Sequence, residues 1–418
     1  MRFLLQQIIA TLQITPMSFI RLSLLASILL GLVSCSTTPR QPPAAPSEPA
    51  VPVAPARPVP SPAELPGLPR TEINSALRPV TFAVLPGWKS DDQREALPAF
   101  LASCAVLIRR PDWKGACAAG ANVDVSDDDA ARKFFENYFV PYRVANPDGS
   151  LSGTVTGYYE PLLQGARKRG GRYQTPLHGA PDDILTIELA SVFPELKGQR
   201  VRGRLVGNKV VAYPSRAELN KSNALAGKEI LWVDDAIDAF FLQVQGSGRV
   251  QLDDGKEIVR LAYADQNGQP YKSIGRYLID KGELTLDQAS AQGIKAWVRA
   301  NPKRQQELLN ANPSYVFFRE EKVTDPNVGP KGALGVPLTP QRSIAVDPQY
   351  IPLGAPVFLS TTQPNSNVAL QRLVLAQDTG SAIKNAVRAD YFWGFGAQAG
   401  EQAGRMKQRG AMWVLLPK

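Results

Sequence analysis

The stretch Leu373–Gly396, LVLAQDTGSAIKNAVRADYFWGFG, places two aspartates in contrasting surroundings. Asp378 follows a strand-like apolar run and precedes small residues, which let a ligand approach closely. Asp390 stands beside an aromatic cluster, where a low local dielectric raises the pKa of a carboxyl group. A carboxylic acid that stays protonated near neutral pH can donate its proton, so the stretch predicts a site for acid–base chemistry. A turn at Asp378 and a salt-bridged Asp390 are the structural alternatives.

The composition is that of a globular protein with extensions. The chain has 418 residues, of which 44% are hydrophobic and 20% charged, so two domains with packed cores are expected. The formal net charge of +9 is compatible with an anionic partner such as a nucleic acid, a membrane or a wall polymer. The basic residues are dispersed, which disfavours nucleic acid. The single histidine, His178, argues against a histidine-based zinc site or a Ser-His-Asp triad, and we predict neither a metal nor a cofactor.

The first 35 residues have the pattern of an export signal. The apolar run Leu22–Leu32 follows a basic residue and is too short to span a membrane. It ends in Leu-Val-Ser-Cys, so Cys35 is predicted to become the lipidated first residue of a lipoprotein. Ser36 favours the periplasmic face of the outer membrane in a Gram-negative cell. A cleaved leader without lipid is the alternative, and translation starts at either Met1 or Met17.

Residues 36–70 are rich in Pro and Ala, so we expect an extended tether without a core. Beyond the tether, Cys104 and Cys117 are the remaining cysteines, and in an exported protein they predict a disulfide. Helices are predicted to begin near Ser90 and Ser126, because each heads a run of acidic residues that favour a helix N-terminus.

From Leu151 onward, short apolar runs separated by Gly and Pro predict a mainly β protein with flanking helices, built from barrels or sandwiches. The most helical part is predicted at residues 271–299, with a short continuation to Asn310. The candidate strands cover residues 80–85, 154–159, 231–233, 240–244, 257–263, 343–347, 357–359 and 412–416.

Two predicted strands end in residues that suit a sugar-like ligand. Tyr158 ends one of them, and Gln245, Gly246, Ser247 and Gly248 end the other. A tyrosine ring stacks on a sugar, an amide bonds to its hydroxyls, and small residues allow close approach. Hairpin turns with buried tyrosines explain the same pattern equally well.

A series of ordered motifs, spread over residues 80–417, resembles the membrane-bound lytic murein transglycosylase A family. The motifs are GYYEP (157–161), FFLQVQGSGRV (240–250), NGQPYKSIGRYLIDKGEL (267–284), NPSYVFF (312–318), RSIAVDPQYIPLG (342–354), DTGSAIK (378–384) and RADYFWGFG (388–396). The C-terminal part, about residues 330–417, resembles the domain named for three aspartates, which are here Asp347, Asp378 and Asp390.

The resemblance implies a double-psi β-barrel, a second and smaller β-barrel inserted into it, and a groove between them for a glycan strand. Residues 71–160 and 266–418 would form the first barrel, and residues 161–265 the insert. The implied substrate is peptidoglycan, cleaved between N-acetylmuramic acid and N-acetylglucosamine with formation of a 1,6-anhydro ring. The implied partners are glycan strands, the outer membrane through the lipid anchor, and other wall-synthesis or wall-hydrolysis proteins.

The implied reaction needs one catalytic carboxyl group, because the C6 hydroxyl of the sugar attacks its own anomeric carbon. By resemblance, Asp390 protonates the glycosidic oxygen and then accepts the hydroxyl proton. Asp378 would be a supporting carboxylate, and Asp347 a structural one that bonds locally in its turn. Ala382 and Lys384 would contact the substrate together with the strand-end residues named above.

Two positions depart from the family pattern that follows Asp378. Ser381 and Asn385 stand where that pattern has glycine. Asn tolerates left-handed backbone angles, whereas Ser381 is expected to alter the groove floor. Glu160 is a rival carboxylate near the predicted groove.

Two other functions fit the same residues. One is a glycoside hydrolase that uses Asp378 and Asp390 as a pair, as ordinary glycosidases do. The other is a lipoprotein that binds wall glycans without cleaving them.

Overall fold

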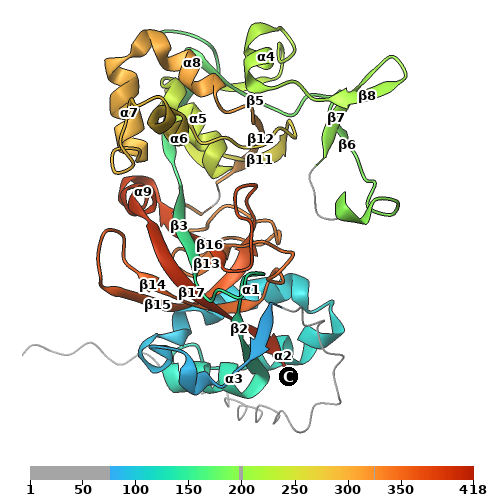
Figure 1. Cartoon of the computed structure of the whole chain (residues 1–418), viewed down its shortest axis with the longest axis vertical. Coiled ribbons are helices and arrows are strands. Elements are labelled where there is room, and N and C mark those ends of the chain that lie inside the picture. The colour runs from blue at the N-terminus through green and yellow to red at the C-terminus, as the bar shows by residue number, and fades with distance from the viewer. Residues whose placement is uncertain (1–75, 197–200, 324) are drawn as a thin grey trace, which may run out of the picture. The chain divides into compact units, whose positions relative to one another are not determined.

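The computed structural model describes residues 76–196, 201–323 and 325–418 (Figure 1). The predicted signal, the lipidated Cys35 and the tether at residues 36–70 lie outside the described residues. Within the described part, no helix is both long enough and apolar enough to cross a membrane.

The larger sheet has eight strands in the order β1-β2-β17-β14-β15-β13-β16-β3 (Figure 1). β17 pairs with both β14 and β3, so six of these strands close into a ring. The strands are β1 (Leu77–Pro79), β2 (Phe139–Val144), β3 (Gly153–Glu160), β13 (Ser343–Ala345), β14 (Pro356–Thr362), β15 (Ala369–Asp378), β16 (Arg388–Phe395) and β17 (Lys407–Pro417). The mainly β prediction is confirmed, and the closure leaves the ring strands without free edges.

Three helices pack against one part of this sheet and share its core: α1 (Leu97–Leu107), α2 (Pro111–Gly120) and α3 (Asp128–Tyr138). The helix predicted near Ser126 is α3, which Asp127 caps by accepting a bond from the Ala130 amide. The helix predicted near Ser90 begins later, with a 3-10 turn at Gln93–Glu95 that leads into α1. α9 (Gly396–Arg405) packs against β3 and β16.

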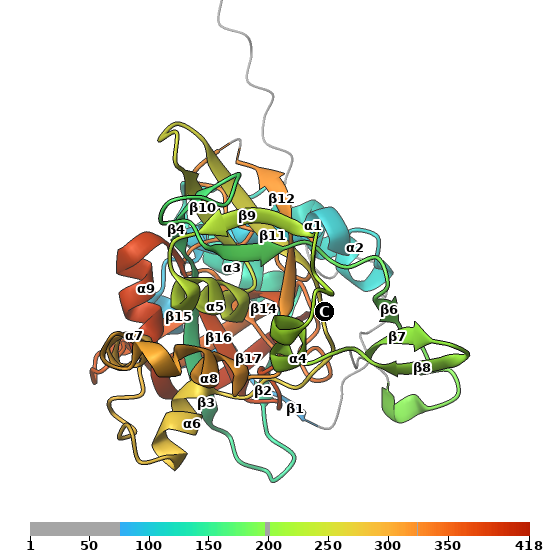
Figure 2. The ribbon, with the colours of Figure 1, turned by 90° about the horizontal axis from the view of Figure 1, so that it is seen from above.

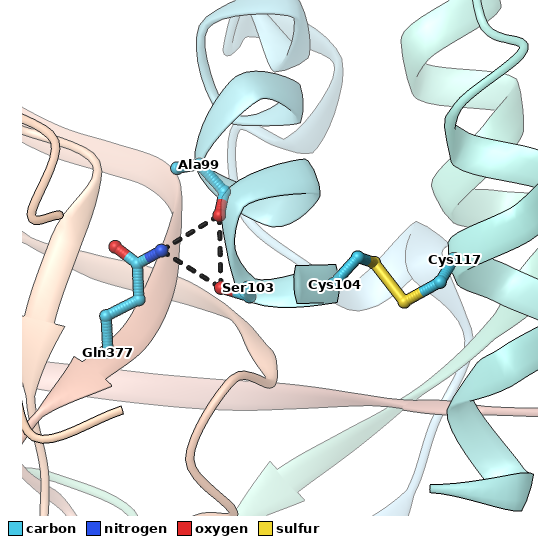
Figure 3. Close-up of a disulfide and its surroundings, with 5 residues drawn as sticks. All are labelled: Ala99, Ser103, Cys104, Cys117 and Gln377. Carbon is cyan, nitrogen blue, oxygen red and sulfur yellow. Dashed lines mark hydrogen bonds between the residues drawn. A yellow bond between two sulfur atoms is a disulfide. The ribbon is translucent and has the colours of Figure 1, made fainter. Parts of the chain in front are cut away.

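The predicted disulfide between Cys104 and Cys117 is present and joins α1 to α2 (Figure 3). Beside the disulfide, Gln377 reaches α1 from β15. Its amide nitrogen donates to the Ala99 carbonyl at 2.8 Å and to the Ser103 hydroxyl at 2.9 Å (Figure 3). Gln377 is fully buried and directly precedes Asp378, so the disulfide-linked helices hold the end of the strand that carries this carboxylate.

The second sheet has six strands in the order β12-β11-β10-β4-β9-β5 (Figure 2). A three-stranded sheet, β6-β7-β8, is formed within the same part of the chain. These strands are β4 (Leu162–Ala166), β5 (Thr175–His178), β6 (Leu185–Thr186), β7 (Arg202–Val206), β8 (Lys209–Ala212), β9 (Glu229–Val233), β10 (Gly248–Leu252), β11 (Ile258–Gln266) and β12 (Val316–Lys322). β12 lies beyond residue 265, so this sheet extends past the predicted end of the insert.

Four helices of this second part share a separate apolar cluster. They are α5 (Ala236–Gln245), α6 (Ile274–Asp280), α7 (Ala291–Ala300) and α8 (Gln305–Asn310), the last three from the region predicted to be most helical. The helix α4 (Arg216–Lys221) packs in another cluster through Leu219.

Two predicted strands are wrong. Residues 240–244 lie in the helix α5, because Asp235 caps its first amides and Gly246, at φ +83°, ends it in a left-handed conformation. A short apolar run is compatible with a buried helix and with a buried strand, so the residues at its two ends indicate which of them forms. Residues 80–85 form a 3-10 turn at Phe82–Val84 instead of a strand.

We predict that replacing Cys104 and Cys117 together by serine lowers the free energy of unfolding by about 3 kcal/mol, because the cross-link restricts a short loop of the unfolded chain. Urea unfolding of the full chain, with and without a reductant, measures the loss. The reductant should destabilise the parent and leave the double variant unchanged. A parent protein whose unfolding is insensitive to the reductant would contradict the prediction.

Candidate functional site

Asp390 lies on β16 directly opposite Thr156 on β3, in the parallel pairing of these two strands. The Thr156 hydroxyl donates a hydrogen bond of 2.6 Å to Asp390 Oδ1. This is the one hydrogen bond that the described residues make to the Asp390 carboxyl group. Arg388, two residues earlier on the same strand, adds a positive charge nearby. One oxygen of Asp390 is therefore held in place, and the other is available to a ligand.

Asp378 ends β15 and is held more tightly. Its Oδ1 accepts bonds of 2.9 Å from the amides of Ala333 and Thr379, and its Oδ2 accepts a bond of 3.1 Å from the Tyr158 hydroxyl. Tyr158 lies on β3 two residues after Thr156, so both side chains point to the same face of the strand. One strand thus supplies a hydroxyl donor to each carboxylate.

Burial raises the pKa of Asp390 above its ordinary value of 3.8, against the opposing effects of the Thr156 hydrogen bond and the Arg388 charge. Burial also raises the pKa of Asp378, against its three hydrogen bonds, and the neighbouring Asp390 charge adds to the rise. Burial and the two aspartates raise the pKa of Tyr158 far above 10, so Tyr158 remains a donor.

The raised pKa values of the two aspartates determine how their contribution to stability changes with pH. A carboxyl group whose pKa is higher in the folded chain favours folding below its ordinary pKa, and this contribution is lost as the pH rises through the raised value. At neutral pH both aspartates therefore destabilise the fold, which is typical of residues kept for function. The three donors around Asp378 favour its anion, so Asp390 is the better candidate for an acid.

Both carboxylates line one cleft, which encloses about 730 Å³ of space open to solvent. The lining residues come from both sheets, and they include Tyr158, Asp378 and Asp390 on one side and Arg216, Gln243 and Gln245 on the other. A second hollow shares Tyr271 and Ser381 with the cleft and adds Ala382 and Lys384. The two hollows therefore adjoin each other.

The predicted ligand-binding residues separate into two groups. Tyr158, Gln245 and Gly246 line the cleft, although Gln245 and Gly246 end a helix and not a strand. Gln245 also accepts a bond from the Tyr159 amide, which ties α5 to β3.

Ser247 and Gly248 line neither hollow. Gly248 is buried at the start of β10, where a Cβ atom would lie 2.3 Å from the Leu242 side chain. The position needs glycine because two segments pack closely there, and its role in ligand binding stays a prediction.

Asp347 lies outside the cleft and is buried. Its Oδ2 accepts a bond of 3.0 Å from the Asn385 amide, and its Oδ1 one of 3.2 Å from the Gln349 amide. Asn385 has φ +97°, a region that Asn tolerates better than most residues. The carboxylate therefore fixes the loop between β15 and β16, on which Ser381 and Lys384 lie.

Glu160 is an ion-pair partner and does not reach the cleft. Its side chain is fully buried and pairs with Arg249 at 2.8 Å and Arg260 at 2.6 Å. A carboxylate bound by two arginines is stabilised as an anion and has no access to a substrate. The rival role considered for Glu160 is therefore not supported.

Several residues that line the cleft or bond to its carboxylates were not predicted from the sequence. Thr156 could have been found, because in a strand that ends at Tyr158 the residue two positions earlier shares its face. Arg216, Gln243 and Asn312 come from separate helices and loops, and no local pattern joins them.

Models of two known protein families match two separate parts of the chain. A family model for the MltA specific insert domain matches residues 154–319, and a model for the 3D domain matches residues 342–416. LtgG, a lytic transglycosylase of Burkholderia pseudomallei, is 53% identical, with a TM-score of 0.56 over 84% of this chain and 98% of that one. MltA of Neisseria gonorrhoeae is 42% identical, with a TM-score of 0.72 over 87% and 98%.

A third relative is the membrane-bound lytic murein transglycosylase A of Escherichia coli K12. It is 34% identical over 267 residues, which are 62% of this chain and 64% of that protein. A structure of E. coli MltA with bound chitohexaose aligns with a TM-score of 0.61 at 25% identity, over 84% of this chain and 94% of that one.

The insert domain and the 3D domain together define a protein of the MltA type. The chain belongs to the membrane-bound lytic murein transglycosylase A family, as its likeness to the solved Burkholderia and Neisseria proteins over nearly their whole length shows.

We predict that Thr156→Val raises the pKa of Asp390 further, because the lost hydrogen bond favours the anion. Carbon NMR titration of the labelled carboxyl group measures this shift. Thr156→Ser keeps a hydroxyl and should restore the parent titration. A pKa that falls or does not move in the valine variant would contradict the assignment of this bond.

We predict that Glu160→Gln lowers the free energy of unfolding by about 3–5 kcal/mol, because it leaves two buried arginines without a counter-charge. Urea unfolding measures the loss. A variant of unchanged stability that had lost its activity would restore Glu160 as a catalytic candidate.

Proposed function

We propose that the protein is a peptidoglycan lytic transglycosylase that acts in cell-wall turnover and remodelling. It would cleave the β-1,4 bond between N-acetylmuramic acid and N-acetylglucosamine and leave a 1,6-anhydromuramic acid end. The family membership supports this proposal, as does the chito-oligosaccharide held by the E. coli relative. The observation that carries it is a cleft with two carboxylates, of which only Asp390 retains an oxygen without a described donor.

In the proposed mechanism, Asp390 enters the reaction protonated. It gives its proton to the glycosidic oxygen as the bond from the anomeric carbon to that oxygen breaks. The C6 hydroxyl of the muramic acid then bonds to the anomeric carbon and passes its proton to Asp390. The acid is regenerated, and no water is consumed.

The three donors to Asp378 fix its orientation in the cleft. We assign Asp378 the supporting role. An anion in this position would stabilise the positive charge that develops at the anomeric carbon and would help to position the substrate. The loop held by Asp347 would present Ala382 and Lys384 to the neighbouring sugars.

Two finer assignments belong to the same proposal. The closed ring of six strands is consistent with a double-psi β-barrel. A lipid on Cys35 would hold the protein at the periplasmic face of the outer membrane, with the Pro- and Ala-rich segment as a tether toward the wall.

A two-carboxylate hydrolase is the second candidate, because Asp378 and Asp390 line the same cleft. In that reaction a water molecule, activated by one carboxylate, would take the place of the C6 hydroxyl. The two reactions differ in the product end, which is an anhydro ring in one case and a reducing sugar in the other.

The test is mass spectrometry of the products after the full chain digests purified peptidoglycan. We expect muropeptides lighter than the hydrolysed forms by one water molecule. Asp390→Asn should reduce turnover by about two orders of magnitude or more and leave folding and glycan binding intact. Asp182→Asn, at a largely exposed carboxylate, is the matched control and should retain the parent turnover.

Reducing-end products would replace the proposed reaction with hydrolysis. Activity of the Asp390→Asn variant within a few-fold of the parent would refute the assignment of the acid. Glycan binding without any product would favour a wall-binding lipoprotein.

A further inference from the structure

Arg216 is a buried arginine with a rigidly held guanidinium group. It is the first residue of α4 and only 5% exposed. Its Nε donates to the Asn312 carbonyl at 3.1 Å, and its Nη2 donates to the Gln243 side chain and the Ser314 carbonyl, both at 2.6 Å. Three acceptors from two segments of the chain, residues 312–314 and α5, therefore fix one edge of the group.

Aromatic rings fix its faces. The guanidinium carbon lies 4.8 Å from the centroid of the Phe240 ring and 4.9 Å from that of Tyr315. Such contacts stabilise a cation by the ring quadrupole and restrict its movement. The group is preorganised, so little entropy would be lost when it binds a ligand.

The charge of Arg216 is not neutralised by the described residues. The other buried arginines in the described part, Arg249, Arg260 and Arg342, each form an ion pair with a carboxylate. Arg216 forms none within residues 76–196, 201–323 and 325–418, and its acceptors there are two backbone carbonyls and one side-chain amide. Burial lowers its pKa to about 10, against the opposing effect of Tyr315. A buried cation without a counter-ion is costly, so its position requires another explanation.

The remaining edge of the Arg216 guanidinium group, with Nη1, faces the cleft. Arg216 lines the same cleft as Asp378 and Asp390, and Nη1 makes no hydrogen bond to a described residue. The acids lie on the barrel side, whereas Arg216 belongs to the second sheet's side. A ligand that fills the cleft would therefore meet a proton donor from one domain and a fixed cation from the other.

We propose that Arg216 is a specificity-determining residue that binds a carboxylate on the peptide substituent of the glycan. This inference rests on the proposed function, since peptidoglycan sugars carry peptides with free carboxylates. A neutral oligosaccharide such as chitohexaose has no such group. The contact would be a charge-assisted hydrogen bond from Nη1, and it would let the enzyme distinguish peptide-bearing glycan from neutral glycan.

The first experiment varies the ligand and leaves Arg216 intact. Isothermal titration of the full chain carrying Asp390→Asn measures the Kd of peptidoglycan fragments with free carboxylates and of the same fragments after amidation. We expect amidation to weaken binding about tenfold or more, as the loss of a hydrogen bond to a charged group would. Equal Kd values would overturn the proposal.

The second experiment adds Arg216→Lys to the Asp390→Asn chain. Lysine keeps the charge but cannot reach the three fixed acceptors and a ligand together. The preference for free carboxylates should disappear, while the Kd of chitohexaose should change less than that of the anionic fragments. Arg276→Lys, at an exposed arginine of α6 outside the cleft, is the matched control and should keep the preference.

Two outcomes separate this inference from the proposed function. If the parent protein yields no anhydro product but keeps an Arg216-dependent preference for free carboxylates, the proposed reaction is contradicted and the proposed binding site is retained. Anhydro product together with equal binding of free and amidated fragments would retain the reaction and refute the site. If the role of Arg216 were purely structural, Arg216→Lys would weaken the binding of neutral and anionic ligands to the same extent.

Discussion

The parallel pairing of β3 with β16 is the constraint on which the site depends. It joins residues more than two hundred positions apart and sets Asp390 opposite Thr156. Because side chains alternate along a strand, the same pairing sends Tyr158 to the face where Asp378 ends β15. A shift of one residue would turn both hydroxyl donors away from their carboxylates. The register of a single strand pair therefore sets which hydroxyl group donates to each acid.

The surrounding structure keeps these two carboxyl groups buried and fixed in position. The ring of strands encloses an apolar core, and Gln377 ties the end of β15 to the disulfide-linked helices. Asp347 fixes the following loop through Asn385. Because burial raises the pKa of Asp378 and of Asp390, their contribution to the stability of the fold falls as the pH rises toward neutral. The rigidity of the neighbouring elements keeps the site in place despite this cost.

Sequence reasoning succeeded where local chemistry decides the outcome and failed where packing decides it. The caps of α3, the disulfide and the strand that ends at Asp378 follow from residue types at short spacing. Residues 240–244 were assigned to a strand, because a short apolar run does not distinguish a buried strand from a buried helix. The motif around Gly248 likewise does not reveal that this glycine packs against the Leu242 side chain.

The amino-acid sequence by itself determined the mainly β class, the disulfide and the two aspartates as candidate residues, because strand patterning, cysteine pairing and a carboxylate beside aromatics are local properties. Only the tertiary structure decided which carboxylates share a cleft, that Glu160 is neutralised by two arginines, and that the buried Arg216 has no counter-ion among the residues that the structure describes. Burial and electrostatic partners arise from contacts between distant segments, and a linear pattern does not specify the distances across which charges interact.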